Sequence, residues 1–402
     1  MNLFLRVLAA ANSFLFNRHV KLNHGLHLAY CTNIHRGENW QETFAGLQQY
    51  TLAVRDRVCP AGPYAIGLRL SERASFELSH PATLSAFRKW LDANHCYVFT
   101  INGFPFGRFH GGPVKEKVYA PDWTSSERLA YTNRLFDLLA QLLPPGIEGS
   151  VSTVPGSFKE FIKTPEQLKL IRDNIFHCVE HVARVCHQTG RTMHLGLEPE
   201  PLCLLETTNE TIHFFDRLRA EHHRDPRLLE FLGVNYDTCH MAVEFEDPKT
   251  AISHLQHHQI KISKLHLSTA LRVTPSPEAR VALAAFTDDV YLHQVVSRDQ
   301  NNHLTRFRDL PDALAQESGD EWRIHFHIPL HSPETELFGN TTDHLLGVFD
   351  ILAQNPKLCS HLEMETYTWE VMPEEMKNLD VVEQLVAEYE WTLDQLRQRQ
   401  LA

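Results

Sequence analysis

Residues 231–240, FLGVNYDTCH, most strongly constrain what this chain can fold into. With the two-residue period of a strand, one face of this stretch is apolar and the other ends in Asp237. The same pattern recurs in three other stretches, which bring a glutamate or a histidine near their ends: HLGLE at Glu198, ISKLHLS at His266 and HLEMET at Glu365. Parallel strands that deliver polar side chains at their C-terminal ends are typical of the active site of an α/β barrel.

Strand-like and helix-like segments alternate along most of the chain. The expected strands cover residues 27–33, 64–70, 97–102 and 149–154 and the four stretches above, and the expected helices cover residues 40–58, 81–94, 124–143, 164–190, 210–222, 248–258 and 343–354. This alternation indicates parallel strands with helices outside them. Eight such units predict a (β/α)8 TIM barrel in a single domain, residues 1–402.

The alternation is interrupted over residues 270–330, which we expect to form an insertion within the barrel. Residues 290–296 and 304–308 predict a β-hairpin that follows the seventh strand. A second irregularity is the long loop over residues 103–123. Loops of this length inside a compact domain are usually functional.

A further strand over residues 323–330, which carries His325 and His327, exceeds the eight strands of a simple barrel. We assign it to the insertion and give the eighth position to the strand at Glu365. A charged helix over residues 374–402 is expected to follow as a C-terminal extension.

The net charge of −12 and the lack of a basic stripe argue against nucleic acid as the main partner. Eight scattered cysteines without a C-x-x-C pair predict reduced thiols in a cytoplasmic protein. No run of about 18 apolar residues exists, so we expect no membrane-spanning segment. Residues 1–11 lack the basic start of a secretory signal, and Arg6 interrupts their apolar run, so we expect an ordinary N-terminal segment.

Carboxylate and imidazole groups without cysteine suit a divalent ion such as Mn²⁺, Mg²⁺, Co²⁺, Fe²⁺ or Zn²⁺. Such an ion can polarise a carbonyl and a hydroxyl of a bound sugar and stabilise an enediolate while a proton is removed. Two glutamates beside the ion could serve as base and acid, which suits isomerisation or epimerisation next to a carbonyl. The alternative use of the same ion is to activate water for hydrolysis.

The order of strands ending in Glu198, in Asp237 with His240, in His266 and in Glu365 resembles the xylose-isomerase-like TIM barrels, the sugar phosphate isomerase/epimerase superfamily. The resemblance implies that Glu198, Asp237, His266 and Glu365 bind a divalent metal. It also implies that Glu198 and Glu365 move the proton, and that His240 contacts the substrate or supports a ligand.

More narrowly, the motifs YCTNIH at 30–35, NYDTCH at 235–240 and ETYTW at 365–369 resemble the EboE group of metabolite-traffic proteins. That resemblance covers nearly the whole chain. It implies a cytoplasmic protein that handles or exports a small metabolite, with possible protein partners in the export pathway. The hairpin insertion and the strand of His325 and His327 depart from the simple superfamily pattern.

Several residues have competing interpretations. Glu363 shares a strand face with Glu365, and Glu200 follows Glu198 in the next loop, so each is an alternative ligand. Direct ligation by His327 is a further alternative. The expected substrate-binding residues lie at or just after strand ends, or on the inserted strand: Asn33, Asn102, His110, His240 and His327. Cys239 is expected to be a small buried apolar residue rather than a nucleophile.

Three functions follow from these observations. The first is a metal-dependent isomerase or epimerase that acts on a sugar-like or polyhydroxylated carbonyl compound. The second is a metabolite-binding or export-complex protein whose metal site holds a ligand without turnover. The third is a metal-dependent phosphoester hydrolase, for which the acidic charge makes DNA a poor substrate.

Overall fold

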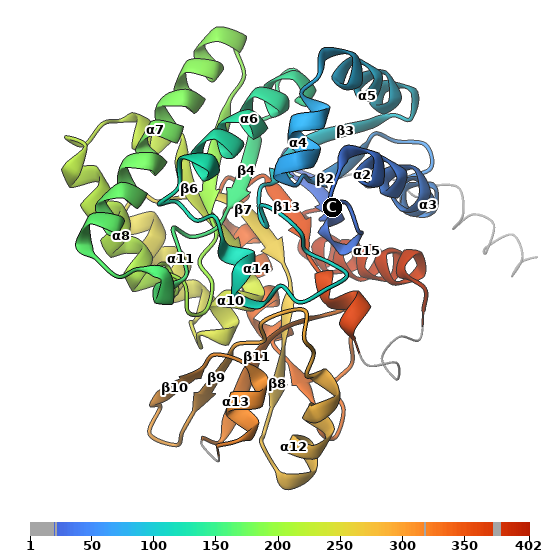
Figure 1. Ribbon diagram of the computed structural model, residues 1–402. Coiled ribbons are helices and arrows are strands. Elements are labelled where there is room, and N and C mark those ends of the chain that lie inside the picture. Colours follow the sequence, from blue (N-terminus) through green and yellow to red (C-terminus); the bar gives the residue numbers. More distant parts are fainter. Residues whose placement is uncertain (1–19, 21, 317–318, 373–378) are drawn as a thin grey trace, which may run out of the picture.

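The computed structural model describes residue 20 and residues 22–316, 319–372 and 379–402. Among these residues, eight parallel strands form one sheet in the order β1-β13-β7-β6-β5-β4-β3-β2 (Figure 1). An isolated parallel bridge between Cys31 and Gly67 joins the two ends of the sheet. The strands of this barrel are β1 (His27–Tyr30), β2 (Tyr64–Arg69), β3 (Cys96–Asn102), β4 (Gly149–Thr153), β5 (Met193–Leu197), β6 (Leu232–Asp237), β7 (Lys261–Leu267) and β13 (His361–Met364). The predicted TIM barrel is confirmed.

Helices follow the strands and cover the outside of the barrel, as expected when both faces of a parallel sheet are buried (Figure 1). Their main members are α2 (Trp40–Gly46), α3 (Leu52–Val58), α4 (Glu72–Leu78), α5 (Pro81–Ala93), α6 (Ser126–Leu142), α7 (Pro165–Thr189), α8 (Thr208–Glu221), α9 (Arg227–Glu230), α10 (Thr238–Val243), α11 (Pro248–His257), α14 (Thr342–Gln354) and α15 (Val381–Gln398). None of the described helices is long and apolar enough to cross a membrane.

Helix α7 shows how local sequence sets the ends of these helices. Thr164 and Gln167 form a capping box at its start, where Pro165 occupies the first turn. Gly190 ends the helix with a φ of 66°, a left-handed conformation that glycine adopts at low cost. These signals predicted a helix over residues 164–190, and the structure confirms it.

The last described helix, α15, begins at Val381. Asp380 caps it by accepting hydrogen bonds from the backbone N–H groups of Val382 and Glu383. The predicted start at residue 374 falls among residues 373–378, which lie outside the described residues, as do residues 1–11. Helix α15 contacts α3 and α14, so it lies in the outer layer of helices beside the barrel.

Residues after β7 form a second, antiparallel sheet with the order β10-β9-β11-β8-β12. Its strands are β8 (Thr269–Val273), β9 (Val295–Arg298), β10 (Leu304–Phe307), β11 (Glu321–Ile328) and β12 (Gly339–Asn340), accompanied by α12 (Pro277–Leu283) and α13 (Leu310–Leu314). The predicted hairpin is β9–β10, and the strand of His325 and His327 is β11. The sequence did not predict β8 or β12, and the inserted sheet extends past residue 330 to Asn340.

The inserted sheet has its own apolar core, which includes Phe286, Phe307 and Trp322. It lies at one end of the barrel in Figure 1, where β8 follows β7 after one residue, Ser268. The long loop of residues 103–123 is bound to the insertion, because Lys115 Nζ donates to Asp309 Oδ2 at 2.7 Å. The insertion and the loop together border the C-terminal end of the barrel strands.

The Glu388 side chain on α15 gives a test of how the outer helix packs. Its Oε1 accepts hydrogen bonds from the Leu330 N–H at 3.0 Å and the Thr366 hydroxyl at 2.7 Å, while Oε2 has no partner. Burial raises the pKa of Glu388 to about 7. The folded state therefore retains a proton that the unfolded state loses at lower pH, and this contribution to stability disappears as the pH rises toward 7.

We expect the free energy of unfolding of the unmodified protein to fall by about 2–3 kcal/mol relative to that of Glu388→Gln between pH 5 and pH 8. Glutamine keeps the size of the side chain and removes its charge. Denaturant unfolding at several pH values measures the difference. Parallel pH profiles for the two proteins would show that Glu388 does not titrate on folding.

Candidate active site

The structure brings the four predicted metal ligands together at the C-terminal ends of their strands. Strand register pairs His266 on β7 with Asp237 on β6, while Glu198 and Glu365 directly follow β5 and β13. One ligand atom from each of these four residues lies within 4.8 Å of the others, and all four side chains are buried. This arrangement can hold one ion, and metal binding by these residues stays a prediction.

The imidazole of His266 lies at the centre of the cluster. Its Nδ1 is 2.8 Å from Glu198 Oε1, 3.1 Å from Glu365 Oε2 and 3.6 Å from Asp237 Oδ2. Its Nε2 lies on the other side of the ring, 2.8 Å from Glu363 Oε2. A histidine that binds a metal through one nitrogen commonly donates the other N–H to a carboxylate.

This geometry separates the roles of the two competing glutamates of the eighth strand. Glu365 contributes an oxygen to the group around His266 Nδ1, while Glu363 accepts from Nε2 and also pairs with Lys264. Glu363 is therefore placed to orient the ring. The structure groups Glu365, which the sequence analysis favoured, with the other candidate ligands.

Buried negative charge exceeds buried positive charge in this part of the barrel. Four carboxylates, those of Glu198, Asp237, Glu363 and Glu365, surround His266 and Lys264. Glu198 Oε2 and Asp237 Oδ2 have no hydrogen-bond partner. Orphaned buried carboxylate oxygens are costly, so this donor set fits a divalent cation.

The protonation states follow from the same charges. Burial lowers the pKa of His266, but the charges of Glu365 and Glu198 outweigh burial and hold that pKa well above its usual value. Burial raises the pKa of Asp237, but His240 and His266 outweigh it and hold that pKa well below its usual value. The Nδ1 of His266 thus carries a proton on the nitrogen through which this histidine would bind a metal ion.

On the Nε2 side of His266, Lys264 and Glu363 form a fully buried ion pair. Lys264 Nζ also donates to Ser152 Oγ at 3.0 Å, and Lys264 is the main positive charge that lowers the pKa of Glu363 to about 2 against the effect of burial. Gly67 on β2 makes room for this ion pair, because a Cβ at that position would lie 2.0 Å from Glu363 Oε1.

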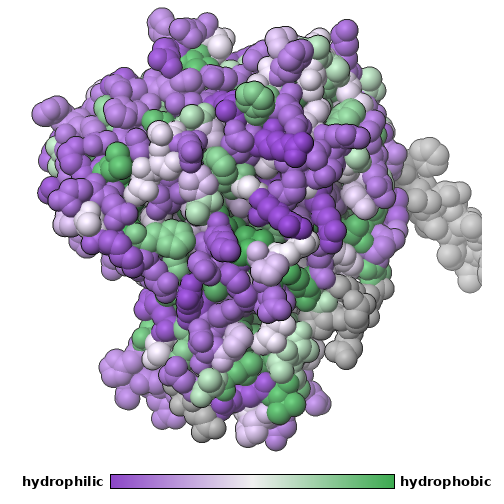
Figure 2. All heavy atoms as spheres, in the orientation of Figure 1, coloured by the Kyte–Doolittle hydropathy of each residue, from purple (hydrophilic) through white to green (hydrophobic). Residues whose placement is uncertain are grey.

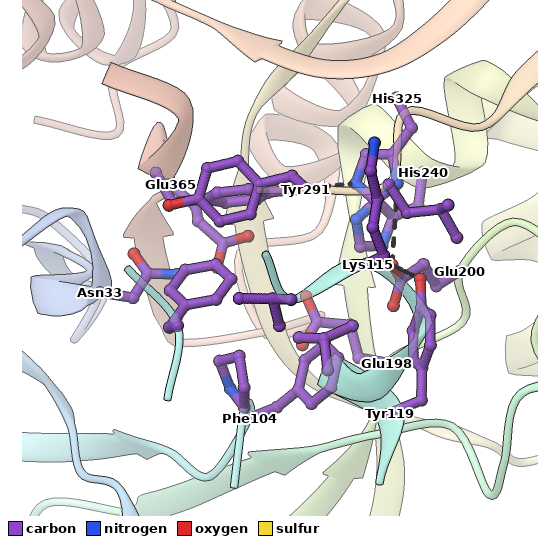
Figure 3. Close-up of a pocket in the computed structure, with 16 residues that line it drawn as sticks. Asn33, Phe104, Lys115, Tyr119, Glu198, Glu200, His240, Tyr291, His325 and Glu365 are labelled. Atoms are coloured by element: carbon purple, nitrogen blue, oxygen red, sulfur yellow. Dashed lines mark hydrogen bonds and ion pairs between the residues drawn. The ribbon is translucent and has the colours of Figure 1, made fainter. Parts of the chain in front are cut away.

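A pocket with about 490 Å³ of empty space, part of it open to solvent, is lined by two members of the cluster, Glu198 and Glu365 (Figure 3). In Figure 3, Asn33 and Glu365 lie at one side of the cavity and His240, His325 and Glu200 at the other, with Glu198 between them. Aromatic and apolar walls come from the 103–123 loop, from the insertion and from Tyr367.

The face of the molecule in Figure 2 is mostly hydrophilic, with apolar side chains gathered mainly near its centre and over the inserted sheet.

Two of the predicted substrate-binding residues border this pocket. Asn33 Nδ2 donates to Glu365 Oε1 at 2.7 Å, which places the amide beside a predicted acid/base group. His240 lines the opposite side, and its backbone N–H donates to Asp237 Oδ1 at 3.0 Å. Burial lowers the pKa of His240, but Asp237 and Glu200 outweigh burial and raise it overall.

Three other predicted substrate-binding residues do not line the pocket in the part of the chain that the structure describes. His110 donates from Nε2 to the Asn33 carbonyl and accepts from the Tyr291 hydroxyl, so it supports the wall. Asn102 accepts from the Phe104 N–H and holds the start of the long loop. His327 lies behind His325, with its Nε2 3.2 Å from the Nε2 of His325.

No protein-family model matches the sequence, and no curated protein matches it. Solved structures match nearly the whole chain. An L-ribulose 3-epimerase matches at 13% identity and a TM-score of 0.50, covering 93% of this chain and 95% of that one. A xylose isomerase-like TIM barrel protein from Mycobacterium smegmatis in complex with magnesium matches at 12% identity and a TM-score of 0.50, covering 94% and 97%.

This chain has the xylose-isomerase-like TIM-barrel fold. At these identities the likeness establishes the fold alone, and it confirms the fold class that the strand-end pattern predicted. The narrower resemblance to the EboE group is not confirmed, and it stays a prediction.

Several residues in or near the pocket of this xylose-isomerase-like barrel were not predicted from the sequence, or were considered only as alternatives. Glu200 was considered only as an alternative ligand, yet it is buried, lines the pocket, and has its pKa raised by burial to about 7. Tyr119 and Gln294 contact each other near Glu200 and had no recognisable motif. The two-residue spacing of His325 and His327 on one strand was the signal for a shared face.

The predicted apolar role of Cys239 fits its surroundings. It packs in a small buried cluster with Val243, Ala270 and Val296. Burial and the charge of Asp237 hold the pKa of its thiol well above the usual value, which disfavours a thiolate nucleophile.

We expect Lys264→Met to lower the free energy of unfolding by about 3–5 kcal/mol, because the substitution leaves the buried Glu363 charge without its lysine partner. The double variant Lys264→Met/Glu363→Gln should recover part of this loss, since it removes the unpaired charge. Denaturant unfolding of the two variants measures the coupling. Equal destabilisation in the single and double variants would contradict the buried pair.

Proposed function

We propose that this protein is a divalent-metal-dependent isomerase or epimerase that acts on a sugar-like, polyhydroxylated carbonyl compound. The observation that carries the proposal is the buried cluster of Glu198, Asp237, His266 and Glu365, of which Glu198 and Glu365 line the pocket. Its two orphaned carboxylate oxygens are what a bound cation would satisfy. The structural similarity to L-ribulose 3-epimerase supports the proposal through the fold only.

A divalent ion held by these four residues would supply the electrophile that polarises a carbonyl and its neighbouring hydroxyl. The protein's own groups do the rest. Glu198 and Glu365 reach the pocket from two different strands, so one can accept a proton from carbon while the other returns a proton. Asn33, by donating to Glu365 Oε1, fixes the direction of that carboxylate. The aromatic walls limit the access of water.

We expect the purified protein to contain about one equivalent or more of Mn, Fe, Co, Zn or Mg, and His266→Ala and Asp237→Ala each to lose the ion of this cluster. Elemental mass spectrometry on the purified proteins measures the content. His303→Ala is a matched control, because His303 is an exposed histidine whose side chain keeps 80% of its accessible surface. Retention of the full metal content in both cluster variants would contradict the site.

We expect the metal-loaded protein to exchange a carbon-bound proton of a ketose with solvent deuterium. Glu198→Gln and Glu365→Gln should each reduce the exchange rate by about 100-fold or more, because each removes one acid/base group. Nuclear magnetic resonance on a panel of ketoses and their phosphates measures the exchange. A sugar that binds in the pocket without any exchange would replace the enzyme proposal with that of a metabolite-binding protein.

We also propose the narrower assignment to metabolite traffic, which rests on the three EboE-like motifs of the sequence and includes possible protein partners in an export pathway. A cytoplasmic location belongs to the same proposal. It is supported by the eight cysteines, all of which are free and buried.

A further inference from the structure

The walls of the pocket contain two groups of aromatic rings. In one group, which belongs to the long loop after β3, the Tyr119 ring stacks on Phe104 with ring centroids 5.8 Å apart. In the other group, Phe109 contacts Tyr291 of the insertion and Tyr367, which follows β13, with ring centroids 5.1 Å apart in each pair. In Figure 3, Phe104 and Tyr119 lie at the lower side of the cavity and Tyr291 at the upper side. Aromatic side chains therefore border the cavity on two sides.

The hydroxyl groups of two of these tyrosines are already bound to protein partners. Tyr119 donates to Glu200 Oε1 at 2.6 Å and accepts from Gln294 Nε2 at 2.7 Å. Tyr291 donates to His110 Nδ1 at 2.5 Å. Because their polar ends are occupied, these tyrosines offer a ligand the apolar carbon of their rings.

The positive charge on the walls is also engaged within the protein. Lys115 is the one lysine or arginine among the described residues that line the pocket. Its ammonium donates to Asp309 Oδ2 at 2.7 Å and to the Asp288 carbonyl at 2.6 Å. The other acidic or basic side chains of the lining, besides histidines, are carboxyl groups: Glu198, Glu200 and Glu365. A phosphate group of a ligand would find no free lysine or arginine on these walls.

Two polar atoms of lining residues have no partner and suit hydroxyl groups. Asn33 Nδ2 donates to Glu365 Oε1, while Asn33 Oδ1 is buried and unpaired, so the open position on this amide is a hydrogen-bond acceptor. Glu200 Oε2 is also buried and unpaired. A carboxyl oxygen pairs with a hydroxyl group in either protonation state. The polar part of the lining therefore fits an uncharged, hydroxylated group.

We propose that the substrate of this pocket is an uncharged conjugate, in which a polyhydroxylated carbonyl portion is joined to an aryl group. The carbonyl portion binds beside Glu198 and Glu365, and the aryl group packs against the aromatic walls. The inference rests on the proposed function for the carbonyl portion and adds the aryl group to it. Aromatic rings in stacked or edge-to-face contact are stabilised beyond the burial of their surface, which favours an aryl group at these walls.

The test measures ligand binding to the metal-loaded, full-length protein by isothermal titration calorimetry. The probes are D-fructose, D-tagatose, D-psicose and D-sorbose, each as the free ketose, as its 6-O-benzyl ether and as its 6-phosphate. These substituents lie far from the carbonyl carbon and leave the reacting end unchanged. We expect the best benzyl ether to bind at least about 10-fold more tightly than its free ketose, since it buries apolar surface. The matching phosphate should bind at least about 10-fold more weakly than the free ketose.

Variants of the wall test where the aryl group binds. Phe104→Ala removes one ring, and the ratio of benzyl-ether affinity to free-ketose affinity should fall to about 3-fold or less. Phe76→Ala is the matched control, because Phe76 lies on α4, is 63% exposed and is not a lining residue; the ratio should not change. If Phe104→Ala does not fold, Val118→Asp takes its place and should abolish the preference by placing a charge in the apolar wall.

The outcomes separate this inference from the proposed function. Tighter binding of a benzyl ether, without exchange of its carbon-bound proton, supports the aryl site and overturns the enzyme proposal. Proton exchange of free ketoses, together with equal or weaker binding of every benzyl ether, overturns the aryl site and leaves the proposed function in place. A benzyl preference that survives unchanged in the folded wall variant, or tightest binding by a phosphate, also overturns the inference.

Discussion

The arrangement of this protein depends on an excess of negative charge buried inside a closed barrel. The side chains of Glu198, Asp237, Glu363 and Glu365 converge on one imidazole and one lysine, and all four are buried. Charges of one sign can be buried together only if cations are placed among them. Lys264 meets this need on the inner side of His266, and a divalent ion on the outer side would meet the rest.

The barrel also separates the two sides of His266 by function. Register places Glu363 and Asp237 on the strands that flank it, so its Nε2 is bound inward and its Nδ1 faces Glu198 and Glu365, which line the pocket. The inward side contributes to the stability and orientation of the ring. The outward side is where ligand and substrate chemistry takes place, as expected for the C-terminal end of barrel strands.

The inserted sheet changes what this end of the barrel can do. Strand β11 brings His325 to the wall of the pocket with His327 behind it, and the 103–123 loop is bound to the insertion through Lys115. The pocket is therefore built by the barrel and by the insertion together. A plain barrel would supply the carboxylate-rich cluster and His240 without the imidazoles of His325 and His327, so the insertion is the part of the chain that distinguishes this pocket from a simple one.

The sequence by itself determined the barrel, the phase of its strands and the four side chains that converge at its end. These features depend on local periodicity: a period of two places Glu198, Asp237, His266 and Glu365 on inner faces, and parallel strands bring their C-terminal ends together. The start of α15 could not be predicted from charge alone, since the cap at Asp380 decides it. The strands β8 and β12 were missed because short antiparallel strands carry little periodic signal.

The tertiary structure alone decided which nitrogen of His266 is available and which glutamates act at the pocket. Glu363 and Glu365 have the same phase in sequence, and only the three-dimensional position of Lys264 turns one of them inward. The Glu200 carboxylate is bound by Tyr119 and the His325 ring by Gln294, and these partners are distant from them in the chain. Hydrogen-bond partners that come from far apart in the sequence leave no local pattern, so their roles emerge only after the chain has folded.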